Sequence, residues 1–186
     1  SLQLLFIPKL KKLFLDVPNK RSTHKKPMPT SGGIFFVFLG TLGSFYFEFY
    51  LPLLCIPLAI TGLIDDRFNI SIKIRFFMQI LTAIILSNFS LLTIDTHNLF
   101  LDNFLELILL ISLLAIINFV NFMDGIDGLV AGSMIIYLII FSVLVTSSLT
   151  PLIGCLAAFL VFNWSPAKIF MGDVGSSFLG SILFYA

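Results

Sequence analysis

Asparagine and aspartate residues gather in the stretch NFVNFMDGIDGL, which ends a long apolar run. Asn118 and Asn121 are three positions apart, so on a helix they share one face. Asp124 and Asp127 each precede a glycine, and the two glycines favour a break in the helix. A turn in which Asp and Asn bond their own backbone would explain one Asp-Gly pair. Two such pairs behind two asparagines favour a ligand site instead.

A second acidic pair, Asp65 and Asp66, follows another apolar run in ITGLIDDRFNI. The C-terminal end of a helix carries partial negative charge, so two carboxylates there need compensation. In one interpretation Arg67 and water supply it. In the other, a bound cation or a proton-transfer reaction does, and because adjacent aspartates repel, one of them holds a raised pKa and acts as a base.

Two further loops mix charge with turn residues. In NWSPAKIFMGDVGSS, Asp173 or Ser176 could merely cap a following helix. The same helix N-terminus, with Lys168 nearby, would also bind phosphate, and Phe170 would then stack on a base or anchor at the membrane interface. DVPNKRSTHKKPMPTSGGI carries basic residues, prolines and a glycine pair, which suit attraction to anionic lipid or a stiff phosphate-facing loop.

The composition shows which elements must position these residues. The chain is 58% hydrophobic and 11% charged, with a mean hydropathy of +1.06, whereas soluble domains carry roughly a quarter charged residues. Apolar runs recur at close to the roughly 17–25 residues that a membrane span needs. We therefore predict one domain over 1–186, an all-α polytopic membrane protein. The predicted spans are 34–49, 51–64, 76–93, 104–120, 129–147 and 150–163, with another beginning near 177.

Charge distribution predicts the topology. All 11 Lys and Arg residues lie on alternate connections or in the N-terminal flank, and the remaining connections carry only acids. The positive-inside rule places the basic connections in the cytoplasm, which makes this a multi-pass protein of the inner (plasma) membrane. All four motifs lie on these connections, so their carboxylates and amides should meet at the cytoplasmic face. The connections of this set are 16–33, 65–75, 121–128 and 164–176, of which 121–128 carries no Lys or Arg.

The chemistry of this face favours a hard divalent cation. It offers carboxylate and amide oxygens beside Lys and Arg, with no His/Cys cluster. Mg²⁺ takes one or two protein carboxylates and completes its shell with phosphates and water, and Mn²⁺ is an alternative. Acids alone would repel a phosphorylated substrate, whereas acids that hold Mg²⁺ would bind one. We predict a metal–phosphate site at the cytoplasmic face.

Four motifs in order, DVPNKRSTHKKPMPTSGG, DDRFNISIKIRFFMQ, NFVNFMDGIDGL and NWSPAKIFMGDVGSSFLG, span 16–180. In these motifs the chain resembles the polyprenyl-phosphate N-acetylhexosamine-1-phosphate transferases of glycosyltransferase family 4. The resemblance implies transfer of a sugar-1-phosphate from a UDP-N-acetylhexosamine to a polyprenyl (undecaprenyl) phosphate, with release of UMP. RSTH with PTSGG is closer to members serving O-antigen or capsule assembly than to the peptidoglycan enzyme, so the expected lipid-diphosphate sugar would initiate a lipopolysaccharide or another cell-surface polysaccharide.

The resemblance also implies roles for individual residues. Asn121 and Asp173 match the Mg²⁺ ligands, and Asp65 and Asp66 match the catalytic pair that activates the lipid phosphate. Asp124 matches a further active-site aspartate. The residues that match substrate-binding positions are Lys25, Gly125, Asp127, Asn163 and Phe170, with Phe170 stacking on uracil.

Relatives in this family have more spans and a later substrate-contacting cytoplasmic loop, and nothing in this sequence matches that loop. We therefore expect the chain to be truncated relative to the family and inactive alone. Membrane lipids are expected partners, a homodimer is compatible with the resemblance, and nucleic acid is not expected. The alternatives are an inactive fragment of such an enzyme and a transporter, whose carboxylates would lie near mid-span.

Overall fold

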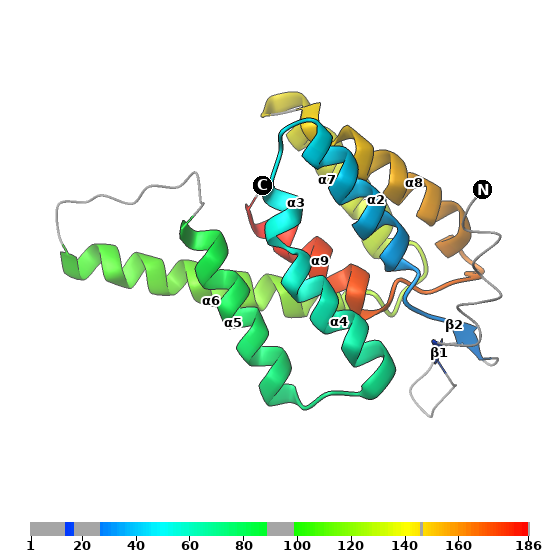
Figure 1. The fold of residues 1–186 in the computed structure, drawn as a ribbon, viewed down its shortest axis with the longest axis horizontal. Coiled ribbons are helices and arrows are strands. Elements are labelled where there is room, and N and C mark those ends of the chain that lie inside the picture. The colour runs from blue at the N-terminus through cyan, green and yellow to red at the C-terminus, as the bar shows by residue number, and fades with distance from the viewer. Residues whose placement is uncertain (1–13, 17–26, 89–98, 146, 186) are drawn as a thin grey trace.

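The computed structural model describes residues 14–16, 27–88, 99–145 and 147–185. These ranges form a bundle of helices with one two-residue strand pair, in which Leu15 lies opposite Pro29 (Figure 1). The all-α prediction is confirmed for these ranges apart from that pair. The elements are β1 (Leu15–Asp16), β2 (Met28–Pro29), α2 (Gly33–Tyr46), α3 (Leu51–Leu54), α4 (Ile56–Phe68), α5 (Ile72–Asn88), α6 (Leu99–Met123), α7 (Leu129–Leu144), the 3₁₀-helix η1 (Ser147–Leu149), α8 (Thr150–Asn163) and α9 (Gly172–Tyr185).

Each predicted span is largely helical where the structure describes it, with departures at 47–49, Cys55 and Val145. By length and composition, Phe100–Met123 of α6 is the one helix in the described ranges that could cross a membrane, with 24 residues and a mean hydropathy of 2.3. Only 17% of its most apolar window is buried inside the protein. The apolar helices Gly33–Tyr46, Leu129–Leu144 and Ser147–Asn163 are shorter. The helices are therefore confirmed, while the polytopic topology stays a prediction.

The helix ends differ from the predicted ones, and the difference matters for the site. The predicted span 51–64 is broken at Cys55, because Pro52 and Pro57 each occupy a first-turn position where the missing N–H is tolerated. α4, α6 and α9 extend further toward the motifs than predicted. Asp65, Asp66 and Asp173 consequently lie on the last or first turns of helices, whereas Asp124 and Asp127 lie in the turn between α6 and α7.

Helix α9 lies in the middle of the bundle and packs against α6, α4 and α2, while α8 packs against α2 and α7 (Figure 1). The core between α2, α8 and α9 contains Phe36, whose ring meets those of Phe159 and Phe178 with centroids 5.4 and 6.5 Å apart. α4 approaches the first turn of α9 at Gly62, where a Cβ would collide with the backbone carbonyl of Asp173. This close approach brings the end of α4 onto the start of α9.

Candidate functional site

Asp173, in the first turn of α9, is the centre of a polar cluster. Its Oδ1 accepts a hydrogen bond of 2.8 Å from the Asn121 side-chain amide at the end of α6. Its Oδ2 lies 3.2 Å from Arg75 Nη1 at the start of α5, and the same Nη1 lies 2.8 Å from Asp65 Oδ2 at the end of α4. We call Asp65, Asp66, Asp124 and Asp173, with Asn121 and Arg75, the carboxylate cluster.

The local turn after α4 orients Asp65. Asn69 ends the helix in the left-handed conformation with φ of 50°, a position that Asn tolerates. The backbone N–H of Ile70 then donates a 2.8 Å hydrogen bond to Asp65 Oδ1. Burial raises the pKa of Asp65, as does its hydrogen bond with Asp173, while the Arg75 guanidinium opposes the rise. Arg67, which the sequence offered as the compensating cation, lies over the ring of Phe68 instead.

Asp66 caps helix α9 from a distant part of the chain. Its Oδ1 accepts a 2.8 Å hydrogen bond from the Asp173 backbone N–H, and its Oδ2 accepts one of 2.6 Å from the Ser31 hydroxyl. Burial raises its pKa to about 6, although these hydrogen bonds stabilise the charged form. The sequence suggested that Asp173 or Ser176 caps this helix, whereas the structure has Asp66 in that role. The Ser176 hydroxyl instead accepts a 2.9 Å hydrogen bond from the Asn121 amide and donates to the Gly172 carbonyl.

Two loops are joined by backbone hydrogen bonds and bring Ser31 to Asp66. Phe170 N–H donates to the carbonyl of Pro29, and Gly32 N–H donates to the carbonyl of Phe170, both at 2.9 Å. Ser31 lies between these bonds, buried, with φ of 61°. The PTSGG loop therefore contributes a hydroxyl to the cluster, and Phe170 is half-buried beside it.

Asp124 belongs to the cluster because its carboxyl lies close enough to those of Asp173 and Asp66 to interact with them electrostatically. Burial raises the pKa of its carboxyl well above the usual range, and the charges of Asp173 and Asp66 raise it further. A hydrogen bond from the Gly172 backbone opposes these effects. Four acids from three parts of the chain thus share one region, and a cation there would relieve their mutual repulsion.

Asn163 and Asp127 form a second arrangement, which we call the glycine turn. Asn163 is 4% exposed, accepts a hydrogen bond from the Gly128 N–H and donates one to the Ile169 carbonyl, both at 3.0 Å. Asp127 Oδ2 accepts a 3.0 Å bond from the Ala167 N–H. These side chains tie the start of α7 to the loop after α8. Their predicted contacts with uridine stay predictions.

The other predicted site residues lie as follows. Gly125 has room for a side chain among the described residues, because the nearest described atom to a Cβ placed there would be the Phe122 carbonyl oxygen, 3.9 Å away. Lys168 is exposed on the loop before α9. Lys25 lies outside the described residues. Three residues at the cluster received no role from the sequence: Ser31, Arg75 and, below them, Gln79. Gln79 could have been found, because it is a rare amide within an apolar run.

The donor set fits a hard cation whose shell is completed by substrate. Within the described ranges, no three His, Cys, Asp or Glu side chains converge closely enough to hold a metal ion by themselves. Mg²⁺ needs only one or two protein carboxylates when phosphates supply the rest. The Arg75 guanidinium already lies between Asp65 and Asp173, so this position suits positive charge. A flipped Asn121 amide would present its oxygen beside Asp173.

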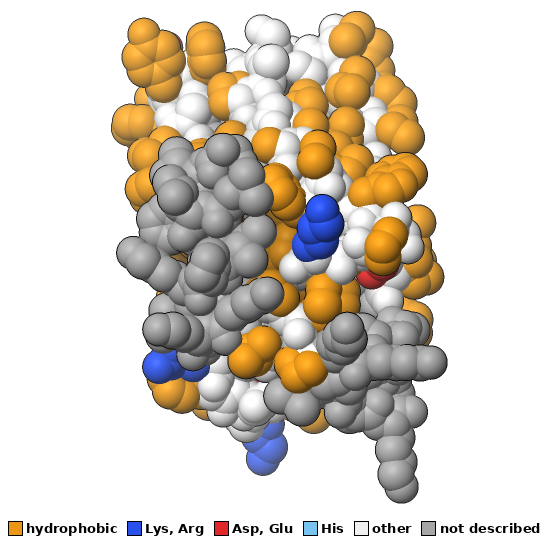
Figure 2. All heavy atoms as spheres, turned by 90° about the vertical axis from the view of Figure 1, so that its right-hand side faces the viewer, with side chains coloured by type: hydrophobic (Ala, Val, Ile, Leu, Met, Phe, Trp, Pro, Cys, Tyr) orange, Lys and Arg blue, Asp and Glu red, His pale blue; other side chains and the backbone are white. Residues whose placement is uncertain are grey.

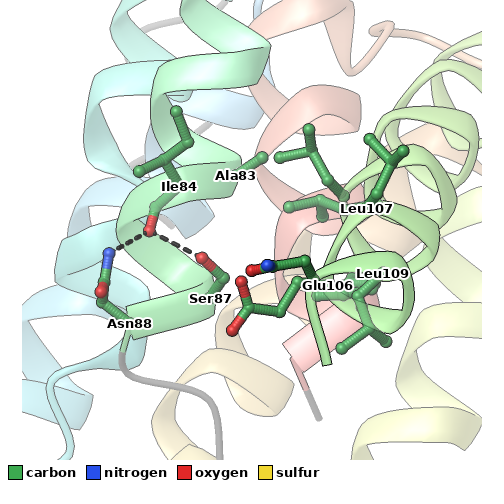
Figure 3. Close-up of a pocket in the computed structure, with 11 residues that line it drawn as sticks. Ala83, Ile84, Ser87, Asn88, Glu106, Leu107 and Leu109 are labelled. Carbon is green, nitrogen blue, oxygen red and sulfur yellow. Dashed lines mark hydrogen bonds between the residues drawn. The ribbon is translucent and has the colours of Figure 1, made fainter. Parts of the chain in front are cut away.

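A cavity lies away from the cluster, between the ends of α5 and α6 that are farthest from it (Figure 3). Its volume is about 450 Å³, and its lining includes Ala83, Ser87, Glu106 and Leu110 but none of the predicted site residues. Many large hydrophobic side chains among the described residues are exposed. Figure 2 shows one face on which hydrophobic side chains are widespread over the described surface and few Lys or Arg side chains show.

Comparisons with known proteins agree with the motifs. The family model for glycosyl transferase family 4 matches residues 48–186. A probable undecaprenyl-phosphate N-acetylglucosaminyl 1-phosphate transferase of Bacillus subtilis is 32% identical, over 89% of this chain and 52% of its own length. An undecaprenyl-phosphate alpha-N-acetylglucosaminyl 1-phosphate transferase of Thermotoga maritima is 33% identical, over 91% of this chain and 55% of its own length.

A shorter match, 50% identical over 54 residues, is to a phospho-N-acetylmuramoyl-pentapeptide-transferase of Streptococcus pneumoniae. The chain spans about half the length of the Bacillus and Thermotoga relatives. The family model covers most of the chain, including three of the four motifs and every acid of the carboxylate cluster. The chain therefore belongs to glycosyl transferase family 4, as its motifs predict.

Proposed function

We propose that the protein containing this chain transfers an N-acetylhexosamine-1-phosphate from a UDP-sugar to undecaprenyl phosphate. The observation that carries the proposal is the convergence of Asp65, Asp66 and Asp173 with Asn121 at the adjoining ends of α4, α6 and α9. The names of the relatives in Bacillus and Thermotoga supply the acceptor and the transferred group. The product would begin a cell-surface polysaccharide.

The reaction needs charge neutralisation and alignment more than covalent protein chemistry. An oxygen of the lipid phosphate attacks the phosphorus that carries the sugar, the bond from this phosphorus to the UMP oxygen breaks, and UMP leaves. Mg²⁺, held by Asp173 and Asn121, would neutralise the diphosphate. Asp65 and Asp66 would orient the lipid phosphate and accept its proton if it arrives protonated.

The donor's uridine would lie at the glycine turn. Two of the predicted contacts, Phe170 and Gly125, support this proposal: the Phe170 backbone is bonded to the loop that carries Ser31, and an added Cβ at Gly125 would meet no described atom closer than 3.9 Å. The Asn163 side chain holds this turn in place, because its oxygen accepts from the Gly128 N–H and its nitrogen donates to the Ile169 carbonyl. Asp127 has one oxygen engaged by Ala167.

Release of UMP from UDP-sugars tests this function. The purified protein containing this chain, given undecaprenyl phosphate, Mg²⁺ and a panel of UDP-N-acetylhexosamines, should form UMP and a lipid-diphosphate sugar in equal amounts. EDTA should stop the reaction, and Mn²⁺ should restore it. Formation of neither product with any donor would contradict the proposal.

We further propose that the carboxylate cluster lies at the cytoplasmic face of the membrane. The described cations support this orientation, since Arg67, Lys73, Arg75 and Lys168 all lie in or next to the connections that form the cluster. A cysteine introduced at Thr96 should react with an impermeant thiol reagent on intact cells, and one at Ser71 should not. The opposite labelling pattern would reverse the orientation.

A further inference from the structure

One helical turn away from the carboxylate cluster, α5 and α6 are joined by hydrogen bonds between the side-chain amides of Gln79 and Asn118. Gln79 Nε2 donates to Asn118 Oδ1 at 3.3 Å, and Asn118 Nδ2 donates to Gln79 Oε1 at 3.0 Å. Gln79 is 4% exposed. Among the described residues, this is the one side-chain hydrogen-bonded connection between the two helices. The amide pair therefore has a directional role that apolar packing between α5 and α6 would not supply.

Several other polar side chains on these helices bond only within their own helix, and Asn118 itself also donates to the Leu114 carbonyl at 2.7 Å. Thr82 and Asn88 of α5 donate to carbonyls of their own helix, and Ser112 of α6 does the same. Such local bonds satisfy a polar group inside an apolar helix without linking it to a neighbour. Gln79 reaches across instead, and reciprocal amide bonds of this kind are a known means of fixing helices against each other in membranes.

The amide pair lies one helical turn from the two residues that hold Asp173. Arg75 precedes Gln79 by four positions, and Asn121 follows Asn118 by three, so each pair shares a helix face. Arg75 and Asn121 reach Asp173 Oδ2 and Oδ1 at 3.2 and 2.8 Å. The two helices are thus connected twice: directly through the amides, and through Asp173 at the cluster.

The two connections border a common space. A cavity of about 10 Å³ is lined by Gln79 together with Arg75 and Asp173. A slip of one helix by a single residue would move its side chains by about 1.5 Å along the axis. That displacement is enough to lengthen either contact with Asp173 beyond hydrogen-bonding range.

We propose that the Gln79–Asn118 amide pair fixes the register of α5 against α6 and so holds Arg75 and Asn121 on the two oxygens of Asp173. Gln79 and Asn118 are positioning residues, because they act through Arg75 and Asn121 and not on substrate. The part of the inference that concerns the metal rests on the proposed function, in which Asp173 and Asn121 are the cation ligands.

The first test uses the purified protein containing this chain and its Gln79→Met variant, which keeps the shape of the side chain without its amide. Mn²⁺ affinity, measured by electron paramagnetic resonance, should fall roughly tenfold, and kcat should fall while KM for the UDP-sugar changes little. The exchange of the two amides, Gln79→Asn with Asn118→Gln, should restore most of the Mn²⁺ affinity. Thr82→Val is the matched control and should leave both quantities unchanged.

Unchanged Mn²⁺ affinity in folded Gln79→Met, or failure of the exchanged pair to restore it, would overturn the proposal. A second test needs no activity. In a double-mutant cycle on thermal unfolding, the loss of Tm caused by Gln79→Met should become smaller when Arg75→Gln is present, because the two residues support one arrangement. Additive losses would overturn the proposal. If the effects of the Gln79 and Arg75 substitutions on Tm are not additive, but the protein releases no UMP, the proposed function is contradicted and this inference still holds.

Discussion

The carboxylate cluster and the glycine turn use the same residue types in opposite ways. In the cluster, side chains meet other side chains: Asp173 faces Arg75, Asn121 and Asp65. In the glycine turn, Asn163 and Asp127 bond only to backbone groups in the contacts described above. The first arrangement gathers like charges that a cation would stabilise, whereas in the second the Asn163 amide and one oxygen of Asp127 already have backbone partners. Convergence of charged groups, and not the presence of Asn and Asp, distinguishes the candidate metal site from the glycine turn.

The largest expected difference is in turnover. Asp173→Ala removes the carboxylate that three parts of the chain approach, and we expect a loss on the order of 100-fold or more in UMP release. Steady-state kinetics at saturating Mg²⁺ measure it. Glu106→Gln, which removes a carboxylate from the far cavity shown in Figure 3, is the control and should keep full activity. Full activity in Asp173→Ala would remove the distinction between cluster and turn.

The glycine turn should respond in stability instead. Asn163→Ala leaves the Gly128 N–H and the Ile169 carbonyl without their partner. A buried unsatisfied group costs about 1–3 kcal/mol, and each kcal/mol lowers Tm by roughly 2–4 °C in a chain of this size. A thermal unfolding scan in detergent measures the effect. If Tm were unchanged and only KM for the UDP-sugar rose, Asn163 would be a direct substrate contact.

Much of this arrangement could be predicted from the sequence. The helices follow from apolar runs, and the four motifs located Asp65, Asp66, Asn121 and Asp173 before their proximity was known. The cation that contacts Asp65 could not be predicted, because Arg67 and Arg75 both lie near in sequence and only the packing of α5 against α6 and α4 selects Arg75. Ser31 was missed for a similar reason, since its approach to Asp66 depends on backbone pairing between loops that are far apart in the chain.

Arg75 sharpens the comparison from within the cluster. Its guanidinium lies between Asp65 and Asp173. The Arg75 side chain is 30% exposed, that of Asp65 9% and that of Asp173 28%. Arg75→Gln leaves the two carboxylates to repel each other, and for partly exposed pairs we expect a loss of roughly 1–2 kcal/mol. Mg²⁺ should raise the Tm of this variant more than that of the unaltered protein, because the ion replaces the lost positive charge. An equal Mg²⁺ effect in both proteins, measured by thermal unfolding, would indicate that no cation binds between these acids.

The smallest effects should come from the two glycines that flank Asp127, and they differ from each other. Gly128 has φ of 71°, where a residue with a Cβ is strained by about 1–2 kcal/mol, so Gly128→Ala should lower Tm by a few degrees. Gly125 does not have a positive φ, and an added Cβ there would meet no atom of the described residues closer than 3.9 Å. Gly125→Ala should therefore leave Tm unchanged. If the open space at Gly125 receives the donor, the added methyl group should still raise KM for the UDP-sugar several-fold while kcat changes little. Measuring Tm and KM in both variants separates a position that shapes the turn from one that faces the substrate. An unchanged KM in Gly125→Ala would exclude Gly125 from the donor site.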